Sequence, residues 1–286
     1  MRFVFAALFA GCATSALAGA WTIERGETRT YITSSFTYGD HGFDADGNLV
    51  AVPEYQKLTL SAALEYGLRP WLTGVVRGEL TEESSEREIA PDLIGHDPQT
   101  FASVAGGARV RLFQGPFWVA STELTAFSGG FSSQGDSKPS DTPGVEVRAL
   151  GGVGTTLYDT PVFADAQLAY RARFDDDASD EVKLDLTLGA QILPNWMILG
   201  QTFSTFEVGG DSDYHKVSAS VVRSITDNLR LEVGGVATVA GTNAIQEFGG
   251  HVGFWWVLPK RRPVDEPDPR LAADYRDFQA YRSIFR

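Results

Sequence analysis

The stretch Val182-Lys-Leu-Asp-Leu-Thr-Leu-Gly-Ala-Gln-Ile192 decides the fold, because apolar and polar residues alternate along its length. Successive side chains of a β-strand point to opposite faces, so Leu184 and Leu186 share an apolar face. Asp185 and Thr187 share the polar face on the other side. Strands of soluble sandwiches usually run about five or six residues, whereas a tilted strand that crosses a bilayer needs about nine to eleven. The length of the alternation therefore predicts a transmembrane β-barrel.

The same pattern recurs along the chain, and it predicts an all-β fold, an antiparallel up-and-down barrel of about twelve strands. The predicted strands are Thr28–Tyr38, Lys57–Leu68, Trp71–Leu80, Phe101–Leu112, Phe117–Phe127, Val145–Tyr158, Val162–Phe174, Val182–Ile192, Trp196–Glu207, Tyr214–Ser224, Leu229–Val239 and Ile245–Leu258. In Trp196–Glu207 either face could point outward. An even number of strands is typical of bacterial single-chain barrels.

Short turns and longer polar segments alternate between these strands. Arg69-Pro70 predicts a tight reversal, whereas Asp40–Glu54 and Thr81–Thr100 are expected to be long loops. In outer-membrane barrels the short turns are periplasmic and the long loops extracellular. We therefore expect both termini of the barrel to lie in the periplasm.

The two ends of the chain differ from the barrel segment, residues 21–258. Residues 1–20 have the pattern of a secretory signal peptide, with Arg2 before a short apolar run and small residues that allow cleavage after Ala18 or Ala20. Residues 259–286 begin as a charged, proline-rich linker. From Leu271 onward, apolar residues recur at helical spacing and predict a short amphipathic periplasmic helix, which either docks on the barrel or membrane or binds a partner.

The overall charge excludes some classes of function. The chain carries 37 acidic against 24 basic residues, which disfavours nucleic acid as a partner. Cys12 is the only cysteine and lies in the predicted signal peptide, so thiolate metal sites are not expected. We expect no metal site and no cofactor.

The histidines do not indicate an enzyme. A nucleophile needs its base within hydrogen-bond reach, and none of the four histidines stands in an H-x-S arrangement. His215 and Ser218 are three residues apart, which in a strand places them on opposite faces. His41 and His96 lie in polar segments rich in Asp. We predict that the protein is not an enzyme and has no catalytic residues.

Charged residues recur on the polar faces of the strands, and we predict that they line the lumen and contact a solute. These predicted lumen residues are Arg77, Glu79, Arg109, Arg111, Glu123, Glu146, Arg148, Asp165, Arg171, Arg173, Lys183, Asp185, Arg230 and Glu232. Inside a narrow barrel such charges must pair or stay hydrated, because an isolated buried ion is costly. A lumen held by salt bridges and a polar conduit for a hydrated solute such as a saccharide both fit this pattern.

Three stretches resemble a known family. They are Gly19-Ala-Trp-Thr22, Phe43-Asp-Ala-Asp-Gly-Asn-Leu49 and Leu64-Glu-Tyr-Gly-Leu-Arg-Pro-Trp-Leu72. On these stretches, and through the barrel, the chain resembles the XagA-like outer-membrane β-barrel proteins. The resemblance implies a Gram-negative cell-surface protein with a role in surface polysaccharide and biofilm, through export or anchoring of an extracellular polysaccharide.

Pattern and resemblance together predict a porin-like outer-membrane barrel for transport or surface presentation of a polysaccharide. The alternative is a structural or adhesive outer-membrane protein with a plugged lumen and acidic surface loops. The expected partners are outer-membrane lipid, a polysaccharide or oligosaccharide, and a periplasmic protein that binds the tail.

Overall fold

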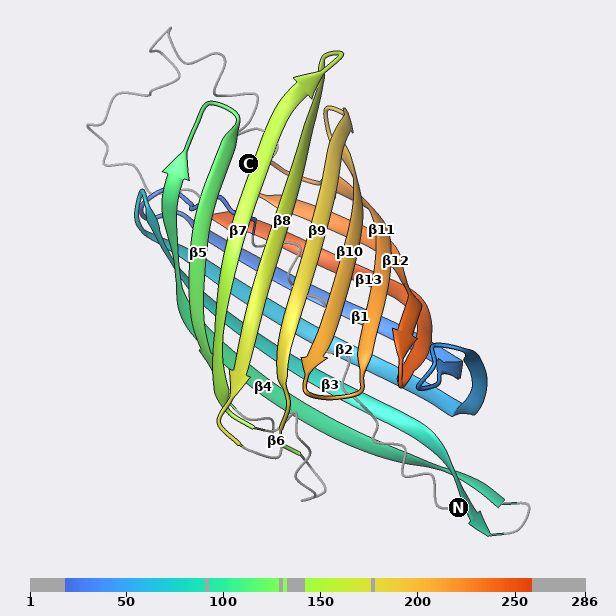
Figure 1. Ribbon diagram of the computed structural model, residues 1–286. Coiled ribbons are helices and arrows are strands. Elements are labelled where there is room, and N and C mark those ends of the chain that lie inside the picture. Colours follow the sequence, from blue (N-terminus) through green and yellow to red (C-terminus); the bar gives the residue numbers. More distant parts are fainter. Residues whose placement is uncertain (1–18, 91–92, 129–130, 133–141, 176–177, 259–286) are drawn as a thin grey trace, which may run out of the picture.

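The computed structural model describes residues 19–90, 93–128, 131–132, 142–175 and 178–258. Thirteen antiparallel strands form one sheet, and the pairing of β3 with β4 closes it into a barrel (Figure 1). The short β6 pairs only with β4, so the other twelve strands make the wall. The strands are β1 (Thr28–Phe43), β2 (Leu49–Arg69), β3 (Leu72–Ala90), β4 (Leu93–Gln114), β5 (Trp118–Phe127), β6 (Phe131–Ser132), β7 (Gly144–Leu157), β8 (Thr160–Arg173), β9 (Asp180–Leu193), β10 (Trp196–Val208), β11 (Asp213–Ser224), β12 (Leu229–Thr242) and β13 (Ala244–Leu258).

The predicted fold class is confirmed, since each of the twelve predicted segments lies within or overlaps one strand of the wall. The prediction of a long loop over Thr81–Thr100 is wrong. There β3 and β4 continue as a paired hairpin, which extends beyond the neighbouring strands (Figure 1). Asp40–Glu54 likewise consists mostly of the ends of β1 and β2. Beyond the bilayer both faces of a strand meet water, so the alternation that marks the membrane-spanning part is no longer required there.

The two ends of the wall meet at one rim, where Thr28 of β1 pairs with Leu258 of β13. The short turn at Pro70 and Trp71 lies at the same rim, as do the turns after β4, β7, β9 and β11. Connections at the opposite rim vary in length. There Asn243 alone joins β12 to β13, with a left-handed φ of 47°.

The stretch that predicted the fold has the predicted faces. Leu186 on β9 is 40% exposed toward the lipid, whereas Asp185 is only 6% exposed and faces the lumen. On β10, for which the sequence left the outward face undecided, Ile198 points outward and Met197 and Leu199 point inward. Both faces of β10 are apolar at this end because its inward residues pack in a cluster inside the lumen, described below.

The predicted ends of the chain fall largely outside the described part. Residues 1–18 of the expected signal peptide and the whole tail, residues 259–286 with its expected helix, are not described. Among the described residues there is no helix that is long and apolar enough to span a membrane.

The turn between β1 and β2 is held by one carboxylate. Asp44 Oδ1 accepts hydrogen bonds from the backbone N–H groups of Asn48 and Asp46, at 2.8 and 2.9 Å. Gly47 in this turn has a φ of 77°, which glycine adopts without strain. The hydrogen bonds from Asn48 favour the charged form and lower the pKa of Asp44.

The assignment of faces can be tested with Leu186→Arg. We expect this substitution to lower the free energy of unfolding by about 2–4 kcal/mol, the cost of an arginine that faces lipid near the midplane. Asp46→Arg, in the aqueous turn, introduces the same side chain and should leave stability nearly unchanged. Urea unfolding of the barrel in phospholipid vesicles measures both. Equal costs would mean that the strand register is wrong.

The turn gives a prediction for acid pH. Because folding lowers the pKa of Asp44, its contribution to stability is complete above the unfolded Asp pKa of about 3.9 and is lost as pH falls through the folded pKa. Carbon-detected NMR of the Asp44 carboxyl group should give a midpoint below the ordinary Asp value. A midpoint at or above that value would contradict the hydrogen bonds described for the turn.

Candidate functional site

The candidate site is the lumen, and the structure places all fourteen predicted lumen residues at inward-facing positions. Eight of them are buried, namely Arg109, Glu123, Glu146, Arg148, Asp165, Asp185, Arg230 and Glu232. The other six are half-buried, namely Arg77, Glu79, Arg111, Arg171, Arg173 and Lys183. Contact of these residues with a solute stays a prediction.

One cluster of charges lies on the wall formed by β2, β3, β4 and β5, and Arg109 is its centre. The Arg109 guanidinium donates to Glu65 Oε1 at 2.7 Å and to Glu123 Oε2 at 2.8 Å. Arg77 donates to the other oxygen of Glu123 at 2.6 Å. Arg109 is 0% exposed, so its positive charge is stabilised by these carboxylates and not by bulk water.

A second cluster lies across β7, β8 and β9. Arg148 donates to Asp185 Oδ2 at 2.7 Å and to Glu146 Oε1 at 2.8 Å. It also donates to the amide oxygen of Gln167 at 2.8 Å, and Gln167 in turn donates to Asp165 Oδ1 at 2.7 Å. The predicted residues on these three strands are therefore linked in one network.

The second cluster continues toward the rim that carries the β8–β9 connection. Arg171 pairs with Glu146 at 2.9 Å, and Glu181 pairs with Lys183 at 3.1 Å and with Arg173 at 2.5 Å. Basic and acidic groups alternate along this wall, so like charges are separated by opposite ones. The wall is polar without having a strong net charge.

Two smaller clusters complete the polar lining. Glu247 on β13 accepts from Lys57 and Lys216, both at 3.0 Å, and from Thr37 at 3.1 Å. These three donors lie on β2, β11 and β1. The cluster therefore ties strands on both sides of β13 together through the lumen.

Glu232 on β12 is the acceptor of the other small cluster. Its oxygens accept from the Ser220 hydroxyl at 2.7 Å and from the Trp255 indole at 3.0 Å, and His251 lies at 3.3 Å. A buried carboxylate with several donors is well satisfied. Glu232 therefore connects β12 to β11 and β13 through its side chain.

The list of fourteen predicted lumen residues leaves out several inward charges, among them Lys57 and Glu181 at strand ends. Lys57 was the first residue of its predicted strand and Glu181 preceded its predicted strand by one position. Both are buried, and both belong to the ion-pair clusters. Extending the two-residue alternation outward, from Thr59 to Lys57 and from Lys183 to Glu181, identifies both. Arg111 and Glu79 lie on the inward face but belong to none of the clusters.

A segment that no periodicity marked also lies in the lumen. Residues Gly19–Glu27, hereafter the N-terminal strap, run inside the wall before β1 begins. Gly26 donates its N–H to the carbonyl of Gly67 at 2.8 Å, and Ile23 donates its N–H to the Thr73 hydroxyl at 3.1 Å. Ile23 is 1% exposed, so this part of the strap is fully enclosed.

The first residues of the strap are bonded to both large clusters. Arg109 donates to the carbonyl oxygen of Trp21 at 3.3 Å, and Ser121 donates to that of Ala20. Ala20 donates its N–H to Asp165 Oδ2 at 2.8 Å. The strap thus connects the wall of β4 and β5 with that of β8.

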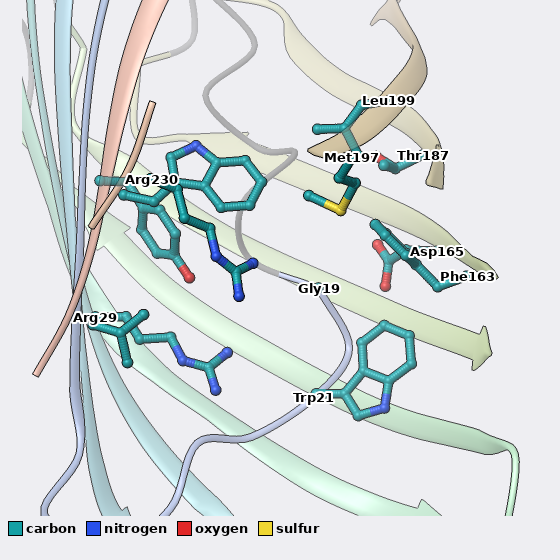
Figure 2. Close-up of a pocket in the computed structure, with 12 residues that line it drawn as sticks. Gly19, Trp21, Arg29, Phe163, Asp165, Thr187, Met197, Leu199 and Arg230 are labelled. Carbon is teal, nitrogen blue, oxygen red and sulfur yellow. The ribbon is translucent and has the colours of Figure 1, made fainter. Parts of the chain in front are cut away.

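A cavity lies beside the strap, between Trp21 and the wall that carries Met197 and Leu199 of β10 (Figure 2). Its other side includes two cations, Arg29 and Arg230, whose guanidinium groups point into the space (Figure 2). The cavity is also lined by the apolar lumen cluster, which is formed by the side chains of Tyr31, Met197, Leu199, Val222 and Trp255; all of these except Val222 face the cavity. The cavity volume is about 30 Å³. That is room for a few waters only.

One serine–histidine pair exists, but it is not the pair that the sequence analysis considered. His215 Nδ1 lies 2.9 Å from Ser204 Oγ, across the β10–β11 ladder and on the outward face. In the part of the chain that the structure describes, His215 has no carboxylate partner. Nor do the described residues contain a group of three His, Cys, Asp or Glu side chains that could hold a metal ion.

The comparisons with solved structures define the class of protein. The chain is similar to the COG4313 outer membrane channel from Pseudomonas putida F1, with a TM-score of 0.59, 13% identity, and coverage of 84% of this chain and 98% of that one. It is also similar to the translocator domain of the autotransporter NalP from Neisseria meningitidis, with a TM-score of 0.50, 10% identity, and coverage of 82% and 89%. The fold is that of Gram-negative outer-membrane β-barrels. No family model and no curated protein matches the sequence.

The Arg109 cluster gives a prediction about stability. Arg109→Ala leaves Glu65 and Glu123 buried without their main partner, which should cost about 3–5 kcal/mol of unfolding free energy. Arg111→Ala, on the same strand face but half-buried and outside the clusters, should cost far less. Chemical unfolding in detergent micelles compares the two. A similar loss for both variants would show that the pairing of Arg109 does not stabilise the wall.

Proposed function

We propose that this outer-membrane barrel exports a surface polysaccharide or presents it at the cell surface, and that its lumen acts as a narrow polar channel. The observation that carries the proposal is the lumen wall, where charged and polar side chains from nearly every strand face inward. The resemblance to XagA-like proteins at Gly19–Thr22, Phe43–Leu49 and Leu64–Leu72 supports a polysaccharide as the solute.

The wall of β10, β11 and β12 supports a solute rich in hydroxyl groups. Gln201 Nε2, Ser218 Oγ and Thr238 Oγ1 are buried and have no hydrogen-bond partner within the described residues. A buried polar group without a partner is unfavourable. A hydrated saccharide offers both donors and acceptors, so it can satisfy such groups.

We further propose the topology and partners that accompany this role. The rim with the short turns and both ends of the wall faces the periplasm, and residues 1–20 are a signal peptide cleaved after Ala18 or Ala20. The tail, residues 259–286, lies in the periplasm and binds a partner protein there. The outward apolar side chains contact the lipid of the outer membrane.

One observation favours the alternative, a structural or adhesive protein with a closed lumen. The N-terminal strap and the apolar lumen cluster leave a cavity with room for only a few waters. A barrel that is permanently closed in this way acts through its surface. The channel function requires that the lumen can open, whereas the structural or adhesive function does not.

Planar-bilayer recording with added oligosaccharides tests the proposal. We expect a steady current that oligosaccharide reduces, and weaker block in Gln201→Ala/Ser218→Ala by about five-fold for each lost hydrogen bond of ~1 kcal/mol. Ser204→Ala removes a hydroxyl from the outward face of β10 and serves as the matched control. A conducting barrel that ignores oligosaccharide would contradict the proposed solute.

A further inference from the structure

We propose that the N-terminal strap is a gate: it holds the lumen closed, and its displacement opens the barrel to ions and small solutes. The inference goes beyond the proposed function, because it holds whichever solute the barrel carries. It rests on the path of the strap, on the glycines that make room for it and on the cavity beside it.

The strap follows the inner face of the barrel wall. From Glu27 back to Gly19 it contacts β2, β3, β4, β5, β7 and β8, which are neighbours in the wall and follow one another in this order. Several of the wall residues that contact the strap lie directly opposite one another on adjacent strands or next to such a pair. Thr73 pairs with Arg109 across β3 and β4, and Gly152 pairs with Asp165 across β7 and β8. A segment that follows the wall in this way narrows the lumen along these six strands.

Two glycines of the wall form a cradle for the strap. A Cβ atom on Gly67 would lie 1.9 Å from the carbonyl oxygen of Glu24, which is far inside van der Waals contact. A Cβ atom on Gly152 would lie 2.5 Å from the ring of Trp21. Both glycines face inward. A larger residue at position 67 would meet the backbone of the strap and exclude it from its present place, whereas one at position 152 would displace the Trp21 ring.

The apolar lumen cluster lies across the cavity from the strap, and Tyr31, Met197, Leu199 and Trp255 of this cluster line the cavity. Figure 2 shows Gly19 and Trp21 facing Met197, Leu199 and Arg230 across a small space. The space holds a few waters and is too small for a sugar ring. Removing Gly19 and Trp21, which line it, would enlarge this space directly.

The strap is held much more weakly than any strand of the wall. Each strand of the wall has a ladder of backbone hydrogen bonds to a neighbour on both sides. The strap is held by scattered bonds, several of them to side chains such as Thr73, Ser121 and Asp165. Segments with few backbone bonds open locally at a lower free energy than the paired core does. The strap can therefore leave while the barrel stays folded.

Gly67→Ala tests the gate, with Gly200→Ala as the matched control, because a Cβ on Gly200 meets nothing within 4 Å. We expect Gly67→Ala to raise the fraction of time that the barrel conducts in KCl by about ten-fold or more, as for a shift in a two-state equilibrium. Gly200→Ala should behave as the unsubstituted barrel. An unchanged conductance in a heat-modifiable, folded Gly67→Ala barrel would overturn the proposal.

A second pair of variants keeps the test decisive if Gly67→Ala does not fold. Asp165→Ala removes the acceptor of the Ala20 N–H, whereas Asp185→Ala removes an equally buried carboxylate that bonds to Arg148 and not to the strap. Opening in Asp165→Ala alone supports the gate. Opening in both variants, or in neither, overturns it. These outcomes concern KCl currents, so they are distinct from a failure of oligosaccharide block.

The gate also selects between the two predicted cleavage positions. Ala20 contributes two of the bonds that hold the strap, so it must be present in the mature chain. The intact mass of the protein isolated from outer membranes should correspond to a chain that begins at Gly19. A mature chain that begins at Trp21 would lack this anchor and would overturn the proposal as stated.

Discussion

The structure depends on one requirement of the bilayer: each backbone N–H and C=O group must be bonded within the protein, because lipid offers no partner. A sheet meets that requirement only when it has no free edge. The pairing of β3 with β4, from Leu72 opposite Val110 onward, removes the last edge of this sheet. Closure then constrains the side chains of each strand: those on the outward face must be compatible with lipid, and those on the inward face must pack or pair within the lumen.

The inside is filled in two different ways. On the walls around Arg109 and Arg148, charges of opposite sign lie within hydrogen-bond distance of one another, which offsets the cost of removing them from water. On the opposite wall, Met197 and Leu199 pack with Trp255 as they would in a soluble core. The strap lies between these two kinds of lining and is hydrogen-bonded to the charged one. The lumen is therefore asymmetric around its circumference.

The sequence predicted the parts of the fold that alternation controls. Leu186 and Asp185 have the expected faces because a one-residue shift would put Leu184, Leu186 and Leu188 inside. The face of β10 could not be predicted, because Met197 and Ile198 are both apolar and only the packing in the lumen distinguishes them. Alternation identified the charges of the lumen but not their partners, which lie on other strands. The strap has no periodicity, so its position inside the barrel depends on contacts with Gly67 and Gly152 that lie far away in the sequence.

The hairpin of β3 and β4 has a physical consequence of its own. Among the described residues, β3 no longer pairs with β2 beyond Ser85, and before Phe101 β4 pairs only with β3, so each strand of the hairpin has one edge without a described partner strand. Such edges are templates for the addition of a strand from another molecule. The sequence there carries Glu86, Glu88 and Asp97. Glu86 lies at the start of the unpaired stretch of β3, and a like charge at this edge of each copy opposes the zippering of two barrels that meet in the plane of the membrane.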